Sequence, residues 1–280
     1  MADFAARLRK HIRLTVQLCF TALTNGYVKG FTEGTIYTGK LKNLCVPGLN
    51  CYSCPGALGA CPLGSLQSAF ATPGSRLPLY LIGFFLLVGS AFGRFVCGWL
   101  CPFGLIQDLL YKIPFFRKRK NLPGHRFLKW LKYAILAGFV ILLPLFALDA
   151  YGIGAPYFCK YICPSGTLTA GLPLALLNEG IRASVSWLFA WKSVLLIALI
   201  ILSLWVYRPF CKYLCPLGAI YGFFNPIAFR RYRVDKAACT KCAACQRACP
   251  ADIQVYEKPN SMECIRCGKC KKACPHGAIR

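Results

Sequence analysis

Four stretches of the chain are apolar over the length of a membrane-spanning helix. A bilayer core of about 30 Å needs roughly 20 helical residues, so each stretch predicts one spanning helix. The first stretch is the most polar, because it contains Gln17, Asn25 and Lys29. The four stretches lie near residues 13–32, 78–97, 130–149 and 188–207.

Basic residues gather in three segments, and all three lie on the same side of the membrane in this four-span topology. Lysine and arginine are retained in cytoplasmic loops, so we expect both termini in the cytoplasm of a multi-pass protein of the plasma (inner) membrane. The loops around 33–76 and 150–187 are then outside, and the lack of a cleavage pattern predicts that the first span is kept. The basic segments contain Arg7, Arg9, Lys10 and Arg13, then residues 112–132, then Arg208, Lys212, Arg230, Arg231 and Arg233.

The composition agrees with membrane segments. Hydrophobic residues make up 56% of the 280 residues, and the mean hydropathy is +0.49. The 34 Lys and Arg outnumber the 9 Asp and Glu, which gives a formal charge of +25. Such an excess is also typical of nucleic-acid-binding proteins. Here the basic residues flank apolar spans, which argues against nucleic acid as a partner.

Eight of the nineteen cysteines lie in a polar segment that begins near residue 234. The sequences CTKCAACQRACP and CIRCGKCKKACP both read C-x2-C-x2-C-x3-C-P, the run of bacterial ferredoxins with two [4Fe–4S] clusters. Three cysteines of a run hold one cluster, and the cysteine before proline holds the other. Zinc and disulfides are the alternatives, but zinc sites rarely show a doubled run and cytosolic thiols stay reduced. The predicted ligands are Cys239, Cys242, Cys245 and Cys274 for one cluster, and Cys264, Cys267, Cys270 and Cys249 for the other.

The sequence therefore predicts an α-helical integral membrane protein with two domains. Residues 1–233 form a four-span bundle built as a two-fold internal repeat, and residues 234–280 form a small cytoplasmic α+β dicluster ferredoxin domain. Basic residues beside the ferredoxin cysteines either dock an acidic electron carrier or reductase subunit, or form a solvated face that offsets the cluster charge. They are Lys241, Arg247, Lys269, Lys271 and Lys272.

Cysteine pairs recur at the ends of the apolar stretches. The sequences CGWLCPFG, CKYICPSG and CKYLCPLG occupy residues 97–104, 159–166 and 211–218, and CPGALGACPLG at 54–64 shares their second half. Residues i and i+4 of a helical turn face the same way, so both cysteines can reach one metal centre. Proline after the second cysteine suits the first turn of a new helix, whose amide groups favour an anionic cluster.

A pair of cysteines needs a partner pair to complete a four-thiolate site. A parallel internal repeat, as in some transporters, predicts an inner cluster on Cys97, Cys101, Cys211 and Cys215. An outer cluster would use Cys159, Cys163 and two of Cys45, Cys51, Cys54 and Cys61, with the repeat match favouring Cys54 and Cys61. Disulfides remain an alternative for the outer cysteines, for example between Cys45 and Cys51. We expect Cys19, inside the first stretch, to be a buried small apolar residue.

These motifs together resemble the NapH/NosR-type membrane polyferredoxins, over roughly residues 10–275. The resemblance implies membrane electron transfer from quinol or cytoplasmic reductants toward periplasmic reductases or flavoproteins, as part of an oxidoreductase complex. It is strongest for the Cys97/Cys101 and Cys211/Cys215 pairs. This chain adds the loop CVPGLNCYSCPGALGACP and the Cys159/Cys163 pair. With these additions, electrons could reach the outer face through iron–sulfur clusters alone.

Motifs of other redox cofactors are missing. The histidines are His11, His125 and His276, outside the apolar stretches, so a bis-histidine haem in the bundle is not expected. The sequence contains no G-x-G-x-x-G strand–helix unit and no P-loop. Electrons must therefore come from a partner or from quinol.

Three functions fit the sequence. The first is a transmembrane conduit from cytoplasmic donors to an extracytoplasmic acceptor, although about 30 Å of hydrocarbon is long for one electron transfer unless the clusters sink into the bundle. The second is a quinol-oxidising subunit with a quinone pocket lined by Trp99, Tyr133 or Trp205, although aromatics of this kind often serve as interface anchors. The third is a redox-sensing or copper-handling assembly factor, which cysteine-rich outer loops would permit.

Overall fold

The computed structural model describes residues 2–72, 78–114, 118–183 and 185–280. The described residues are mostly helical and contain no strand, only three isolated bridges such as the one between Val234 and Ile279. The helices are α1 (Ala2–Thr24), α2 (Lys29–Glu33), α3 (Pro62–Ala71), α4 (Leu79–Phe92), α5 (Phe95–Trp99), α6 (Pro102–Lys112), α7 (His125–Ile135), α8 (Leu143–Phe146), α9 (Tyr157–Tyr161), α10 (Pro164–Gly166), α11 (Leu172–Leu177), α12 (Glu179–Ala183), α13 (Trp187–Trp205), α14 (Pro209–Tyr213), α15 (Pro216–Phe224), α16 (Ala244–Ala248) and α17 (Lys269–Ala273).

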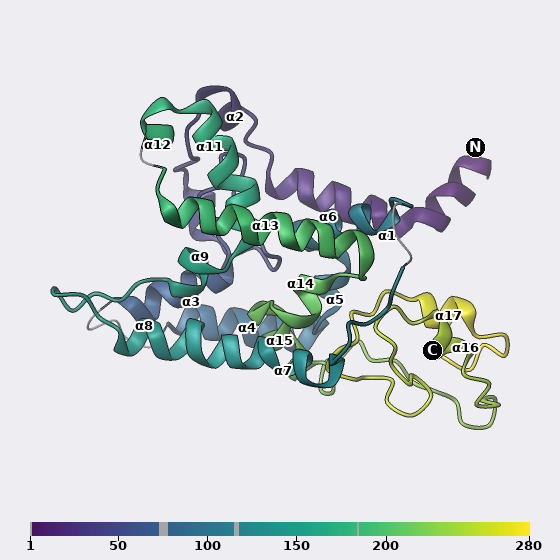
Figure 1. The fold of residues 1–280 in the computed structure, drawn as a ribbon. Coiled ribbons are helices and arrows are strands. Elements are labelled where there is room, and N and C mark those ends of the chain that lie inside the picture. The colour runs from purple at the N-terminus through teal and green to yellow at the C-terminus, as the bar shows by residue number, and fades with distance from the viewer. Residues whose placement is uncertain (1, 73–77, 115–117, 184) are drawn as a thin grey trace.

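Wider π-helical turns continue two of these helices. Leu136–Leu142 joins α7 to α8, and Thr167–Gly171 joins α10 to α11. Helix α6 packs against α1 and α13, whereas α15 packs against α4 and α7. Figure 1 shows the long helices forming a bundle, with the yellow C-terminal segment packed at one end. The short helices α5 and α14, which carry Cys97 and Cys211, lie inside it.

Two helices of the described chain are long and apolar enough to cross a membrane. They are the continuous helix His125–Phe146 and α13, Trp187–Trp205, close to the third and fourth predicted spans. Helix α4 has only 14 residues, and the apolar part of α1 covers Ile12–Thr24. The four-span bundle is therefore not confirmed.

Local chemistry ends helices α1 and α4. The Asn25 side chain donates to the Thr21 carbonyl, which caps the last turn of α1. Helix α4 follows Pro78 and ends at Gly93, whose φ of 53° lies in the region that glycine tolerates best. After these helix ends the chain enters the segments that carry the cysteines of the 45–61 loop and Cys97.

Residues 234–280 form their own small core. Cys245, Cys249, Ile253, Val255 and Cys270 are buried there. No strand is formed among these residues, so the β part of the expected α+β ferredoxin domain is not confirmed. A single antiparallel bridge remains, because most of the segment winds around its cysteines in turns and in the short helices α16 and α17.

Candidate iron–sulfur centres

All nineteen cysteines lie in described segments and are free thiols. The disulfide alternative for Cys45 and Cys51 is therefore not realised. Cys19 is exposed on α1, so the expectation of a buried residue is wrong: it points to a side of the helix that no other described element covers. The other eighteen cysteines belong to the predicted motifs.

The first ferredoxin set surrounds a small cavity as the spacing predicts. Cys239, Cys242 and Cys245 line it together with Cys274 from the second run. Lys241 and Ala243 have positive φ angles of 54° and 56°, as do Arg266 and Gly268 at the matching positions of the second run, with 50° and 79°. These left-handed turns curl each run, so that its cysteines can converge on one centre.

The second ferredoxin set also comes together. Cys249 and Cys264 lie close enough for their charges to interact, and Cys270 interacts with both. Cys267 interacts with the same three thiols. Helices α16 and α17 pack side by side, and this packing brings Cys249, the last cysteine of the first run, to the cysteines of the second run.

A third set lies inside the helical bundle. Cys97, Cys101, Cys211 and Cys215 are each 5–6% exposed, and their charges interact with one another. Cys97 and Cys211 lie on the short helices α5 and α14. Cys101 and Cys215 are the N-cap residues of α6 and α15, each followed by proline in the first turn. The structure thus brings together the four cysteines predicted for the inner site, and we call them the inner set.

Two buried arginines cross between the halves of the inner set. Arg94, three residues before Cys97, donates to the Cys211 carbonyl at 3.0 Å. Arg208, three residues before Cys211, donates to the Cys97 carbonyl at 2.5 Å. The motif glycines Gly104 and Gly218 leave room for these guanidinium groups, because a Cβ atom would lie 3.1 Å and 3.2 Å from them.

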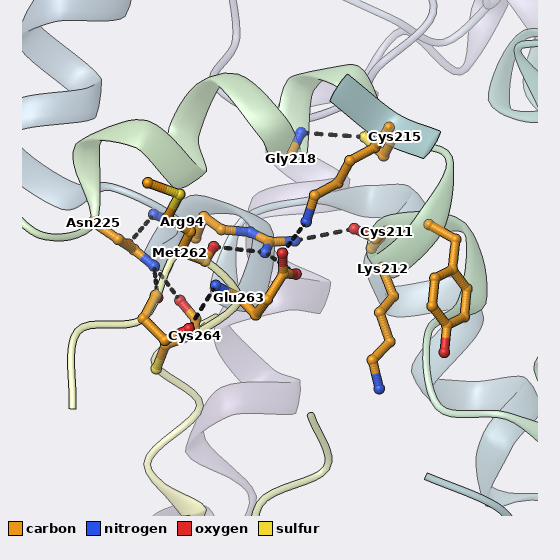
Figure 2. Close-up of polar contacts among 12 residues, drawn as sticks. Arg94, Cys211, Lys212, Cys215, Gly218, Asn225, Met262, Glu263 and Cys264 are labelled. Carbon is orange, nitrogen blue, oxygen red and sulfur yellow. Dashed lines mark hydrogen bonds and ion pairs between the residues drawn. The ribbon is translucent and has the colours of Figure 1, made fainter. Parts of the chain in front are cut away.

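Two carboxylates accompany the arginines. Glu263 of the ferredoxin domain pairs with Arg94 at 2.9 Å and with Lys132 at 2.5 Å; Figure 2 shows Arg94 extended between Cys211 and Glu263. Burial alone would raise the pKa of Glu263, but the two cations lower it to about 2. Asp108 pairs with Arg208, and although burial opposes ionisation, Arg208 lowers the pKa of Asp108 below its ordinary value.

The charge around the inner set suits an anionic cluster. Four cations, Arg94, Lys132, Arg208 and Arg13, share the two carboxylates Glu263 and Asp108. The surplus of two positive charges is buried beside four thiol groups. Thiolate-bound iron–sulfur clusters carry net negative charge, and their potentials respond to such surroundings. The residues present therefore fit a [4Fe–4S] cluster.

The fourth set, which we call the outer set, lines a cavity of about 690 Å³. Its cysteines are Cys51, Cys61, Cys159 and Cys163. Cys54, which the repeat match favoured, does not line this cavity; its thiol bonds to the Asn25 side chain at 3.8 Å. The Cys45 thiol bonds to Ser65, also at 3.8 Å.

Glycines and a lysine complete the outer cavity. Gly64 and Gly166, from the two Cys-Pro-x-Gly sequences, line it, and their Cβ atoms would lie 3.8 Å from the Cys159 sulfur and 3.5 Å from the Cys51 sulfur. Larger residues would fill the space that a cluster needs. Lys192 also lines the cavity and donates to the Cys159 carbonyl at 3.1 Å.

No three His, Cys, Asp or Glu side chains of the described residues converge closely enough to hold one metal ion. The four thiolates of a [4Fe–4S] cluster bind four different iron atoms, so they stand further apart than the ligands of a single ion.

The outer and inner sets share a wall. Leu49 lines the outer cavity and packs in the same buried cluster as Cys101 of the inner set, and a Cβ atom on the neighbouring Gly48 would lie 3.1 Å from the Cys101 Cα atom. Tyr221, which is fully buried, interacts electrostatically with Cys97 and Cys101 on one side and with Cys61 on the other. The 45–61 loop therefore reaches into the bundle instead of staying at its surface.

The ferredoxin domain meets the inner set from the other direction. The Ile265 carbonyl presses on Gly98, where an added Cβ atom would overlap it. Trp99 donates to the Arg266 carbonyl at 3.0 Å, and Asn225 donates to the Cys264 carbonyl at 2.7 Å. The backbone that carries Cys264 and Cys267 is thus fixed directly against the backbone that carries Cys97.

The aromatics expected at a quinone pocket have separate surroundings. Trp99 is held at the domain contact, and Trp205 lies under the Arg119 guanidinium. Tyr133 lines a second cavity of about 690 Å³, beside Phe223 and Met262. Of the three, Tyr133 therefore lines one of the cavities in the described part of the chain.

Buried polar residues around the sets were not predicted. They include Arg94 and Arg208, and also Gln67 and Gln107, whose side chains donate to cysteine sulfurs. The sequence shows them as a repetition: an arginine precedes each inner C-x3-C pair by three residues, and a glutamine follows the cysteine of two Cys-Pro sequences by six residues. Polar residues repeated beside ligands at fixed spacing indicate contacts that support those ligands.

Comparison with known proteins gives the same chemistry. Residues 76–123, 133–174 and 187–233 match the family described as 4Fe-4S binding domain, and residues 258–280 match a further 4Fe-4S binding domain. The chain is a 4Fe-4S polyferredoxin-type protein. Each of the first three segments contains one C-x3-C-P pair of this polyferredoxin-type chain. No solved structure matches it.

Curated relatives of the polyferredoxin-type chain include ferredoxin-type proteins. An uncharacterized protein of Methanocaldococcus jannaschii is 33% identical over 61% of this chain and 64% of its own length. The methylamine utilization ferredoxin-type protein MauN of Methylobacillus flagellatus is 29% identical over 68% and 60%. The ferredoxin-type protein NapH of Haemophilus influenzae is 27% identical over 64% and 54%. The chain thus spans less than two thirds of these relatives.

Proposed function

We propose that the chain conducts electrons across a membrane through four [4Fe–4S] clusters. The observation that carries the proposal is the continuous order of four cysteine sets. The first ferredoxin set is followed by the second, then by the inner set and then by the outer set, with direct contacts at each junction described above. When bound, [4Fe–4S] clusters supply one-electron carriers.

The proposed ligands follow the geometry of the cavities. The ferredoxin sets are Cys239, Cys242, Cys245 and Cys274, and Cys249, Cys264, Cys267 and Cys270. The inner set is Cys97, Cys101, Cys211 and Cys215, and the outer set is Cys51, Cys61, Cys159 and Cys163. Cys45 and Cys54 take no part in this assignment.

The contact between the inner and outer sets supports a conduit. Two centres at opposite faces of a bilayer would be separated by about 30 Å of hydrocarbon. Here Leu49 touches both sites, because the 45–61 loop carries Cys51 and Cys61 into the bundle. The chain therefore needs no further redox group between these two sets.

We place the ferredoxin domain, residues 234–280, on the cytoplasmic side, and the outer set toward the opposite face. Basic segments flank the apolar helices on the ferredoxin side, as cytoplasmic loops do. An electron carrier or reductase subunit with an acidic surface fits the lysine-rich α17 as a donor. An extracytoplasmic reductase or flavoprotein would accept electrons at the outer cavity.

Quinol oxidation is a second candidate, favoured by one cavity. The space beside Tyr133 is lined by Trp130, Phe223 and Met262, and the neighbouring residue Glu263 precedes Cys264 of the second ferredoxin set. An apolar ring fits such walls. Reduction of the clusters by a quinol, lost in Tyr133→Ala, would support this candidate, whereas reduction only by a soluble carrier would favour the plain conduit.

The conduit is tested by iron and acid-labile sulfide in anaerobically purified protein. Four [4Fe–4S] clusters correspond to about sixteen irons per chain. The variant Cys211→Ser/Cys215→Ser should lose about four of them, with one EPR signal, because it removes half of the inner set. Cys19→Ser is the control and should lose none, because Cys19 is exposed and outside every set. A wild-type value near eight irons would refute the conduit, because only the ferredoxin domain would then be loaded.

A further inference from the structure

Two buried glutamines occupy the same place in two cysteine motifs. Gln67 follows Cys61 by six residues in CPLGSLQ, and Gln107 follows Cys101 by six residues in CPFGLIQ. Both lie on the helix that begins with the motif proline, α3 or α6. Their exposed fractions are 0% and 2%. Full burial of an amide side chain requires hydrogen-bond partners.

The two glutamines make the same pair of hydrogen bonds. Gln107 donates through Nε2 to the Cys211 sulfur at 3.1 Å and accepts from the Phe210 N–H at 3.2 Å. Gln67 donates to the Cys159 sulfur at 3.3 Å and accepts from the Phe158 N–H at 2.9 Å. The backbone N–H groups require the amide oxygens, so the NH₂ groups must face the sulfurs.

The second half of the chain does not repeat this arrangement. Thr169 and Tyr221 stand at the matching positions after Cys163 and Cys215. Thr169 bonds to the Ser165 carbonyl, and Tyr221 bonds to the Pro47 carbonyl. Among the described residues, each membrane set therefore receives one side-chain amide, in both cases from the first half of the chain to a cysteine of the second half.

We propose that Gln67 and Gln107 are positioning residues that raise the reduction potentials of the outer and inner centres. The inference rests on the proposed function, since it requires clusters at both sets. Reduction adds one electron to a cluster, and part of the added negative charge resides on the ligand sulfurs. An N–H donor to that sulfur stabilises the reduced form more than the oxidised form, so it raises the potential.

The test is a redox titration followed by EPR on the anaerobically purified full chain. Gln107→Met removes the donor at similar length, and we expect it to lower the potential of one membrane centre alone. Gln67→Met should lower the potential of the other. Gln107→Glu keeps an oxygen for the Phe210 N–H but replaces the donor by a charged acceptor, so its shift should exceed that of Gln107→Met.

Gln17→Met is the matched control. Gln17 is also buried, at 2% exposed, but its Nε2 has no partner among the described residues, so its replacement should shift neither membrane potential. Unshifted potentials in Gln107→Met and Gln107→Glu with about sixteen irons would overturn this inference and leave the conduit standing. Loss of the inner centre in both variants would also overturn it, because the amide would then serve assembly. A wild-type chain with about eight irons would overturn both proposals.

Discussion

Replacing Glu263 by glutamine tests how the ferredoxin domain is held to the bundle. Glu263 is the carboxylate partner of Arg94 and Lys132, whose side chains are 1% and 0% exposed. Glutamine has nearly the same shape but leaves both cations without a counter-charge. Breaking a buried ion pair by removing one partner costs about 3–5 kcal/mol.

The pKa of Glu263 gives a similar magnitude. The folded protein lowers it from 4.5 to about 2, through Arg94 and Lys132 and against the effect of burial. This lowering of the pKa of Glu263 corresponds to about 3 kcal/mol of stability. Because the folded pKa is depressed, this stability is fully present above about pH 5 and is lost as the pH falls from 4.5 toward 2.

The assay is anaerobic urea unfolding of detergent-solubilised protein, followed by cluster absorbance. We expect Glu263→Gln to lose about 3 kcal/mol at pH 6, which lies above the titration of Glu263. Glu179→Gln is the control, because its ion pair with Arg182 is exposed at 92% and 59% and should contribute nothing measurable. A loss in Glu263→Gln below about 1 kcal/mol at this pH would refute the reasoning.

Two further substitutions test the geometry of the sets. Cys51→Ser should lose about four irons, whereas Cys54→Ser should keep them, because Cys51 lines the outer cavity and Cys54 does not. Iron analysis of the two variants measures this, and an equal loss of iron in both would contradict the assignment. Gly98→Ala should destabilise the docked ferredoxin domain by about 1–3 kcal/mol, since its Cβ atom would overlap the Ile265 carbonyl. Gly83→Ala, where a Cβ atom meets nothing within 4 Å, is the control, and limited proteolysis that releases residues 234–280 equally from both variants would contradict the prediction.

Local spacing determined much of this protein. The doubled C-x2-C-x2-C-x3-C-P run predicted the exchange of Cys249 and Cys274 between the ferredoxin sets, and the structure places both cysteines accordingly. The C-x3-C-P pairs predicted a cysteine cap followed by a proline-initiated helix, as Cys101 and Cys215 show. These features depend on neighbours within a few residues, so sequence alone could supply them. The long apolar stretches likewise predicted the helices His125–Phe146 and Trp187–Trp205.

Tertiary structure decided which distant residues meet. Repeat matching favoured Cys54, but the path of the 45–61 loop brings Cys51 into the outer cavity and leaves Cys54 against Asn25. The pairing of Arg94 with Glu263 joins residues 169 positions apart, and no periodicity encodes such a pair. The contact of Leu49 with both membrane sets depends on the same re-entry of the loop. The spacing of cysteines along the sequence determines what each segment can bind. The packing of the whole bundle determines which segments face each other, because this packing must both bury the apolar faces and pair the buried charges.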